Sequence, residues 1–242
     1  MSFISLLGLL ACTSKGKSEA AYETENFPAE NGSPVTVALI KHGSLAISWN
    51  GLSIQVDPVA EYGKHTDYAT EFPKADIILL THEHQDHFDK NAIEALKKPD
   101  TKLFTNEVCA QALGWGTALA NGDKVAVAET ISLEAVPAYN TTEGHTQFHP
   151  KGRDNGFILS LGGFRIYIAG DTEDIPEMED IKDIDVAFLP VNQPYTMTVE
   201  QCVRAAKTIS PKVLIPYHFS DTDLSSLPEQ LPGITVLLRQ MQ

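Results

Sequence analysis

Apolar and polar residues alternate along residues 35–59, VTVALIKHGSLAISWNGLSIQVDPV, and this period of two predicts β-strands. Asn50-Gly51 lies between two such runs and predicts a hairpin turn, because this pair accepts the positive φ angles of tight hairpins. Residues 75–81, ADIILLT, form a continuous apolar run, as expected of a strand buried on both faces. We therefore predict that the folded domain spans residues 35–242.

Helical patterns follow some of these strands. Residues 88–100 predict a helix with Asp89 as N-cap, residues 106–114 a second, and residues 198–210 an amphipathic third. Further strands are predicted at DKVAVA, TISLEAVPAY, NGFILSLGG, FRIYIAGDT, IDVAFLPV and PKVLIPYHFS. Two strand-rich halves, each with helices, predict two sheets packed face to face with the helices outside.

The charge balance bears on the partners. The chain has 18 Lys and Arg against 32 Asp and Glu, which gives a formal net charge of −14 at pH 7. Such a surface repels phosphate backbones, whereas proteins that bind nucleic acids carry a basic stripe. We therefore predict no nucleic-acid partner, and the acidic surface serves solubility. The sequence leaves the oligomeric state undefined.

The first residues, MSFISLLGLLAC, form an apolar run that is too short to cross a bilayer and resembles part of a secretory signal peptide. Its end, LLAC, resembles the lipobox of bacterial lipoproteins, in which the cysteine, here Cys12, is lipidated. The polar residues after it, up to residue 34, are typical of a flexible tether. We therefore predict a lipoprotein held at the membrane through Cys12, in the periplasm or at the cell surface. No Lys or Arg precedes the apolar run, so the alternative is a retained tail on a cytoplasmic protein.

Metal-binding residue types crowd into THEHQDHF, residues 81–88. His82 and His84 are two apart just past a strand end, so their side chains point the same way. Asp86 and His87 follow where the chain turns into a helix, and they can face a second point nearby. Imidazole suits zinc, and a carboxylate suits zinc, iron or manganese. This loop alone therefore predicts ligands for two adjacent metal ions.

HEHQDH matches the H-x-H-x-D-H signature of the metallo-β-lactamase superfamily. Over roughly residues 35–220 the chain resembles its small metal-dependent hydrolases, among them relatives of the ascorbate-phosphate lactonases. The resemblance implies an α/β protein with an αββα sandwich of two mixed sheets. It also implies two divalent metal ions, with zinc expected and manganese or iron as alternatives. His82 and His84 would bind the first metal, and Asp86 and His87 the second.

Three further residues receive roles only through this resemblance. Asp171, in GDT after a late strand, would bridge both metals, and His218 would complete the second site from the end of the final strand. Asp57 would support the ligand loop by hydrogen bonds without touching metal. Taken singly, each of the three has an ordinary explanation as a turn or core residue.

The chain departs from the family pattern at the third ligand of the first metal. Asn140 stands near the position where a histidine is expected, and Asn is a poor zinc ligand. His145 and His149 follow in the same loop, NTTEGHTQFHP. We predict His149, because Pro150 fixes its backbone and the loop leads straight into the next strand. The alternatives are His145, or a first site that stays weak or empty.

The resemblance implies a hydrolase in which two metals activate a hydroxide, with Asp86 orienting it or moving a proton. The expected substrate is a small ester, lactone or phosphodiester. One alternative is an iron-dependent oxidoreductase on the same fold, against which His84 counts. The other is a non-catalytic metal-binding surface lipoprotein, which the departure at Asn140 favours.

Four residues are candidates for contacting the substrate. Lys151 and Arg153 flank the uncertain ligand loop and could bind an anionic group, although solvated surface charge explains them as well. Asn192 and Tyr195 follow a strand at the same edge and could line a pocket, although capping and packing are equally good explanations.

Overall fold

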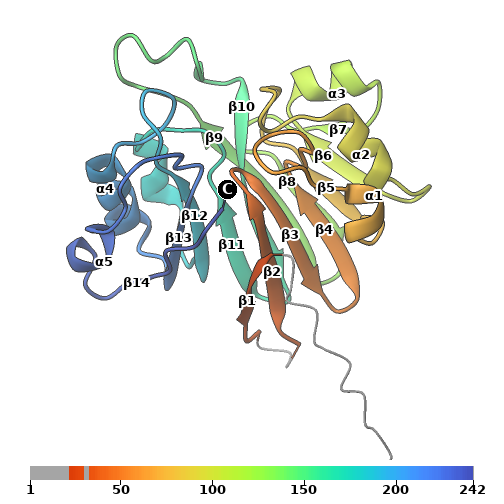
Figure 1. Ribbon diagram of the computed structural model, residues 1–242, viewed down its shortest axis with the longest axis horizontal. Helices are drawn as coiled ribbons and strands as arrows, with labels where there is room; N and C mark the ends of the chain where they lie inside the picture. The colour runs from red at the N-terminus through yellow and green to blue at the C-terminus, as the bar shows by residue number, and fades with distance from the viewer. Residues whose placement is uncertain (1–21, 30–32, 242) are drawn as a thin grey trace, which may run out of the picture.

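The structure is a computed structural model, which describes residues 22–29 and 33–241 (Figure 1). Cys12 lies outside the described residues, so its lipidation stays a prediction. The strands are β1 (Glu23–Phe27), β2 (Val35–Lys41), β3 (Ser44–Trp49), β4 (Leu52–Val56), β5 (Ile77–Leu79), β6 (Lys102–Thr105), β7 (Thr117–Ala118), β8 (Lys124–Ala128), β9 (Ile131–Ala138), β10 (Asp154–Leu161), β11 (Phe164–Ile168), β12 (Val186–Pro190), β13 (Val213–Tyr217) and β14 (Thr235–Val236). The helices are α1 (Tyr68–Glu71), α2 (Lys90–Leu96), α3 (Glu107–Leu113), η1 (Pro176–Asp180, a 3₁₀ helix), α4 (Val199–Ile209) and α5 (Leu227–Gln230).

Within the described part of the chain the strands form two seven-stranded sheets that follow one plan. In the first sheet β1 to β4 pair antiparallel and β4 to β7 pair parallel. In the second sheet β8 to β11 pair antiparallel and β11 to β14 pair parallel. The carboxyl ends of parallel strands lie at the same edge of a sheet. The loops that follow the parallel strands of each sheet therefore lie side by side at that edge.

Figure 1 shows α1, α2 and α3 outside the first sheet, and α4 and α5 outside the second. One apolar core fills the space between the sheets and includes Leu45, Phe157 and Phe188. Two smaller cores lie beneath the helices, one around Ile93 of α2 and one around Cys202 of α4. The predicted αββα sandwich is therefore confirmed, because each sheet buries one face against its partner and much of the other against helices.

Two local predictions, the N-cap of α2 and the turn between β3 and β4, are confirmed. The Asp89 side chain accepts hydrogen bonds from the backbone N–H groups of Asn91 and Ala92, as expected of the N-cap of α2. Asn50 and Gly51 have φ angles of 50° and 80° at the turn between β3 and β4. These positive values are what the hairpin prediction requires.

The folded part of the chain begins earlier than the predicted boundary near Val35. Residues 23–27 form β1, which pairs antiparallel with β2 and extends the first sheet by one strand. The tether prediction is therefore wrong for these residues. In their sequence, ETENF, only Phe27 is apolar and buried. This pattern is too weak to predict an edge strand.

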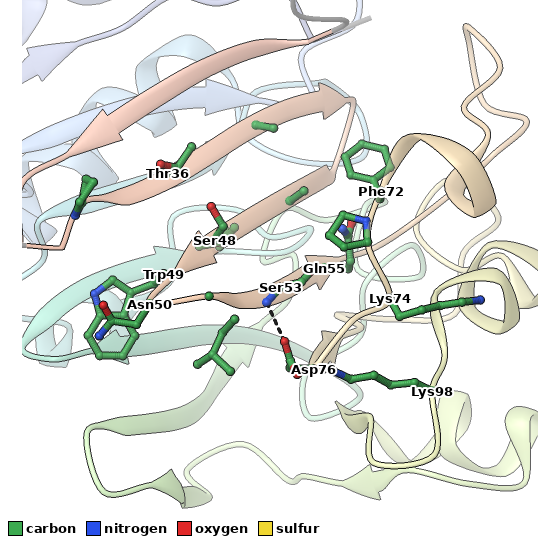
Figure 2. A pocket seen from close by; sticks show the side chains of 17 residues that line it. Thr36, Ser48, Trp49, Asn50, Ser53, Gln55, Phe72, Lys74, Asp76 and Lys98 are labelled. Carbon is green, nitrogen blue, oxygen red and sulfur yellow. Dashed lines mark hydrogen bonds and ion pairs between the residues drawn. The ribbon is translucent and has the colours of Figure 1, made fainter.

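The helices leave part of the outer face of the first sheet open. A hollow of about 560 Å³ lies there, beside Thr36, Ser48 and Gln55 (Figure 2). Asp76 accepts a hydrogen bond from the Ser53 backbone N–H at 2.8 Å and pairs with Lys98. No helix among the described residues is long and apolar enough to cross a membrane.

Candidate metal centre

The predicted ligands come from four loops that are far apart in the sequence. His82, His84, Asp86 and His87 follow β5, Asp171 follows β11, and His218 follows β13. His149 lies in the loop that enters β10. The structure gathers all seven at one edge of the sandwich, and their donor atoms form two adjacent groups.

The first group consists of His82, His84, His149 and Asp171. The ring centroids of its histidines are 4.6, 4.9 and 4.8 Å apart. Imidazole nitrogens bind zinc at about 2.0–2.1 Å, which places ring centroids about 4.5 Å apart at a right angle and about 5.2 Å apart at the tetrahedral angle. The three rings therefore have the arrangement expected of three ligands of one ion.

The second group consists of Asp86, His87 and His218, together with His42, which the sequence analysis did not single out. The rings of His87 and His218 lie 5.3 Å apart, as expected for two ligands of one metal. Asp86 Oδ2 lies 3.6 Å from His218 Nε2. These three residues therefore have the arrangement of a second metal site.

Asp171 faces both groups. Its Oδ2 lies 3.3 Å from His149 Nε2 and 3.1 Å from His218 Nε2, and its Oδ1 lies 3.3 Å from His87 Nε2. Ligand atoms on a tetrahedral zinc ion are about 3.3 Å apart. One carboxylate can therefore serve both metals, which is the role that the resemblance implies for it.

Hydrogen bonds hold the Nδ1 atoms of three of the buried histidines, whereas His218 Nδ1 is buried without a hydrogen-bond partner. His82 Nδ1 lies 2.9 Å from Thr81 Oγ1, His87 Nδ1 lies 2.8 Å from Asp57 Oδ2, and His149 Nδ1 lies 2.9 Å from Asp154 Oδ2. Metal-bound histidines commonly donate their second N–H in this way, which leaves Nε2 unprotonated toward the metal. The fully buried Asp57 also accepts from Thr81 N and Oγ1, so it ties β4 to the ligand loop.

The chemistry of the donors fits divalent metal ions. The Nε2 atoms of His82, His87 and His218 and Oδ1 of Asp171 are buried without a hydrogen-bond partner. Leaving such groups unsatisfied costs roughly 1–3 kcal/mol each, so a structure retains them where something else binds them. Imidazole and carboxylate donors that converge on two points suit zinc, manganese or iron.

His42 is the residue that sequence reasoning missed. Its Nε2 lies 3.0 Å from Asp86 Oδ2, and its ring lies only 3.6 Å from the ring of His218. That ring separation is shorter than the roughly 4.5 Å of two imidazoles bound to one metal at a right angle. We therefore interpret His42 as a residue that packs on His218 and hydrogen-bonds Asp86, although its donor atom lies near the group.

The backbone holds His42 in an uncommon conformation. Its backbone φ is 43°, in the left-handed region that residues other than glycine rarely adopt. Its N–H donates to the Met241 carbonyl at 2.7 Å, and its carbonyl accepts from His218 N at 3.1 Å. At the next residue, Gly43, a Cβ would lie 2.6 Å from His87 Cε1. The turn between β2 and β3 therefore supports the site directly.

The carboxylates and imidazoles shift one another's pKa values. Burial lowers the pKa of His149, but hydrogen bonds to Asp154 and Asp171 outweigh it and raise the value to about 9. In the same way burial is outweighed at His218, where Asp171 and Asp86 raise the pKa to about 10. Without metal both imidazoles are therefore protonated at neutral pH and neutralise the carboxylates.

The structure places His149, and neither alternative, in the first group. His145 is part-buried and points to Glu173, with Nδ1 3.4 Å from Oε1. Asn140 Nδ2 donates to the carbonyls of His145 at 3.3 Å and Tyr195 at 2.7 Å. Asn140 therefore fastens the loop that presents His149. Metal binding by His149 itself stays a prediction.

The two cations proposed to bind an anionic group are already paired. Lys151 Nζ lies 2.7 Å from Glu177 Oε1. Arg153 Nε lies 2.6 Å from Asp154 Oδ1, and its Nη1 lies 3.3 Å from Glu83 Oε1. Both side chains have carboxylate partners in the structure, so neither offers an unpaired charge.

A sandwich of two mixed sheets with two adjacent groups of metal-binding side chains at one edge defines the class of this protein as a metallo-β-lactamase fold. Residues 36–218 match the Beta-lactamase superfamily domain, and the chain belongs to that family.

Relatives cover most of the chain. A UPF0173 metal-dependent hydrolase of Anoxybacillus flavithermus is 30% identical over 217 residues, which are 82% of this chain and 94% of that protein. A crystal structure from Parabacteroides distasonis, of a protein named as a candidate metal-dependent hydrolase, is 53% identical with a TM-score of 0.88, covering 91% of this chain and 100% of that one. Igni18, a metallo hydrolase from Ignicoccus hospitalis, is 26% identical with a TM-score of 0.72, covering 86% and 95%.

Proposed function

We propose that this protein, a metal-dependent hydrolase, holds two divalent metal ions in its two donor groups and cleaves a small ester, lactone or phosphodiester. The observation that carries the proposal is Asp171, whose two oxygens lie 3.1 to 3.3 Å from imidazole nitrogens of both groups. Two separate structural metals would have no need of a shared ligand.

Two metals so close together supply, when bound, a water of lowered pKa and a positive charge that stabilises an oxyanion. The chain's own residues determine where this chemistry is accessible. His84 and Asp86 are only part-buried, whereas the other predicted ligands are buried. A substrate therefore approaches from the side of His84 and Asp86.

Asp86 is suited to orient an attacking water. Its side chain is 27% exposed, and its Oδ2 accepts a hydrogen bond from His42. Burial raises its pKa, but the neighbouring imidazoles of His218 and His42 outweigh this and hold the pKa well below the usual range. Asp86 is therefore ionised at neutral pH and can accept a hydrogen bond from the attacking water.

The described residues provide no thiol nucleophile. Cys109 of α3 and Cys202 of α4 are buried in the two cores beneath the helices, and neither belongs to the donor groups. Burial raises the pKa of each thiol to about 12, so neither forms a thiolate near neutral pH. This supports hydrolysis by water rather than through a covalent thioester.

The experiment is a panel of esters, lactones and phosphodiesters, assayed with protein loaded with Zn²⁺, Mn²⁺ or Fe²⁺ at measured metal content. We expect turnover that needs metal, that falls at least a hundredfold in His84→Ala, and that persists in His65→Ala, whose side chain is exposed. Bound metal without turnover on any substrate would favour a metal-binding lipoprotein. Bound iron with oxygen consumption would favour an oxidoreductase.

We further propose that the mature chain is lipidated at Cys12 and held at the bacterial membrane. The support is the apolar run that ends in LLAC. Intact mass spectrometry of protein from bacterial membranes should show a lipid-modified chain that begins at Cys12. An unmodified chain that begins at Met1 or Ser2 would contradict this proposal.

A further inference from the structure

Two exposed tyrosines flank the metal centre. Among the described residues only four large apolar or aromatic side chains are more than a third exposed, and two of these are Tyr62, at 41%, and Tyr195, at 46%. The Tyr62 ring lies 4.4 Å from the ring of His42, which hydrogen-bonds Asp86. The Tyr195 ring packs edge-on against Phe148, at 5.0 Å, directly before His149 in the chain. One tyrosine therefore stands beside each metal group.

The two tyrosines are fixed with respect to each other. Tyr62 and Ser220 share a side-chain hydrogen bond. Asn192 Nδ2 donates to Ser220 Oγ at 3.1 Å, and Tyr195 N donates to the Asn192 carbonyl at 3.0 Å. The Tyr195 carbonyl in turn accepts from Asn140, which holds the loop of the first group. This series of hydrogen bonds links the segments that carry the two rings into one rim.

The Tyr62 side chain is directed toward the centre. Partial burial raises the pKa of its hydroxyl, and the charges of Asp86 and Asp171 raise it further, as does Tyr195. Tyr62 is therefore neutral at neutral pH, and its ring is available for contact with a ligand.

Three cations lie near the rim, and each is held by other groups: Lys41, which lines the same hollow as Tyr62, donates to the backbone carbonyls of Ala60 and Lys64. Arg153 is held by Asp154 and Glu83, and Lys151 by Glu177. Among the described residues, no side chain of the rim therefore offers a free positive charge, and a negative charge on a substrate would be drawn to the metal ions instead. Flat uncharged rings are the chemistry that exposed tyrosines recognise, through stacked or edge-to-face contacts.

We propose that Tyr62 and Tyr195 form the walls of the substrate site, and that the substrate carries an uncharged aromatic or similarly planar group beside the bond that is cleaved. The inference rests on the proposed hydrolase function, which it deepens by naming a substrate class. Each ring contact strengthens binding by about twofold to tenfold, and the metal centre acts on the bond next to the ring.

Binding can be measured without turnover. N-benzylacetamide, N-(cyclohexylmethyl)acetamide and N-(4-carboxybenzyl)acetamide are titrated into the full-length, zinc-loaded protein and followed by ligand-observed NMR. We expect the benzyl amide to bind at least threefold more tightly than either of the others. Equal binding of the benzyl and cyclohexylmethyl amides would overturn the aromatic preference. Equal or tighter binding of the carboxylated amide would overturn the preference for an uncharged group.

Variants test which residues form the walls. Tyr62→Leu and Tyr195→Leu should each weaken benzyl amide binding by about threefold to tenfold at unchanged metal content. Tyr62→Phe and Tyr195→Phe should retain binding, because they keep the ring. Leu238→Ala is the matched control, since Leu238 is exposed at 37% but is not part of this rim. Leucine variants that bind like the unmodified protein would overturn the proposal, as would an equal loss in Leu238→Ala.

Measurements of turnover distinguish a failure of this inference from a failure of the proposed hydrolase function on which it rests. Benzyl acetate and cyclohexylmethyl acetate have similar size and leaving groups, so their kcat/KM ratio reports the ring. A ratio above three that falls to about one in the leucine variants supports the substrate class. Ester turnover without a ring preference would remove the inference and keep the hydrolase. Ring-selective binding without hydrolysis of any substrate would remove the hydrolase and keep the aromatic site.

Discussion

Replacing Asp57 by Asn should weaken the second metal site, although Asp57 contacts no metal. The buried carboxylate accepts from Thr81 N at 2.8 Å through Oδ1, and from Thr81 Oγ1 and His87 Nδ1 through Oδ2. The asparagine side chain has only one acceptor oxygen. Because the Thr81 backbone N–H can only donate, that oxygen stays directed to Thr81 N. The NH₂ group then faces His87 Nδ1. His87 must accept there and carry its proton on Nε2, where the metal should bind.

The structure sets the size of this effect. Loss of such a supporting carboxylate typically costs 10- to 100-fold in metal affinity, or about 1.4–2.7 kcal/mol. The Thr81 hydroxyl can rotate to accept from the amide, so the main change is at His87, whose hydrogen bond reverses direction and loses its charged acceptor. In the metal-free protein the loss of this buried charged hydrogen bond should lower the free energy of unfolding by about 1.5–3 kcal/mol.

The assay is a chelator-competition titration with Zn²⁺, with metal content measured by mass spectrometry and the His87 tautomer read from ¹⁵N NMR. Asp76→Asn is the matched control, because Asp76 pairs with Lys98 in the hollow on the outer face of the first sheet. We expect two zinc ions in the control and weakened binding of one in Asp57→Asn. Two zinc ions bound to Asp57→Asn within twofold of the original affinities would refute this reasoning.

Three further predictions concern the same centre. His149→Ala should lose one metal equivalent by elemental analysis, whereas His145→Ala should keep both, and full occupancy in His149→Ala would contradict the first group as described. Gly43→Ala places a Cβ 2.6 Å from the His87 ring, so it should reduce affinity for the second metal at least tenfold in the chelator titration, and an unchanged affinity would count against that contact. The pKa values of His149 and His218 are raised in the metal-free protein, to about 9 and about 10. Protonation of these imidazoles therefore stabilises the metal-free fold fully below about pH 6.5, and this stabilisation is lost as pH rises through the two pKa values. Each metal must displace one of these protons, so the zinc affinity of each site should rise from pH 6.5 to 8.5 by up to one decade per pH unit, and a flat profile would contradict the assignment of protonated ligands.

Much of the fold was predictable because its signals are local. Alternating apolar residues identified the central hairpins, Asp89 marked the start of α2, and Asn50-Gly51 marked a turn. The first strand was missed because an edge strand needs little apolar surface, and β1 buries Phe27 alone among its side chains. The helices and 3₁₀ turns of four or five residues likewise give too short a pattern to detect.

The site was predictable only where its residues are close in sequence or match a known pattern. His42 stands singly in a turn between strands, and nothing near it in the sequence indicates a metal centre. Its role depends on the chain's return at the far end, where Met241 and His218 hydrogen-bond its backbone. The pairing of Arg153 with Asp154 and Glu83 was also invisible, because the sequence gives a charge but not its partner.

The central claim is that two metal ions occupy the two donor groups and share Asp171. Anomalous scattering at the zinc absorption edge, measured on crystals of the zinc-loaded protein, tests it most directly. We predict two peaks, one among His82, His84 and His149, and one among Asp86, His87 and His218, with Asp171 between them. A single peak, or a first peak without His149, would contradict the account.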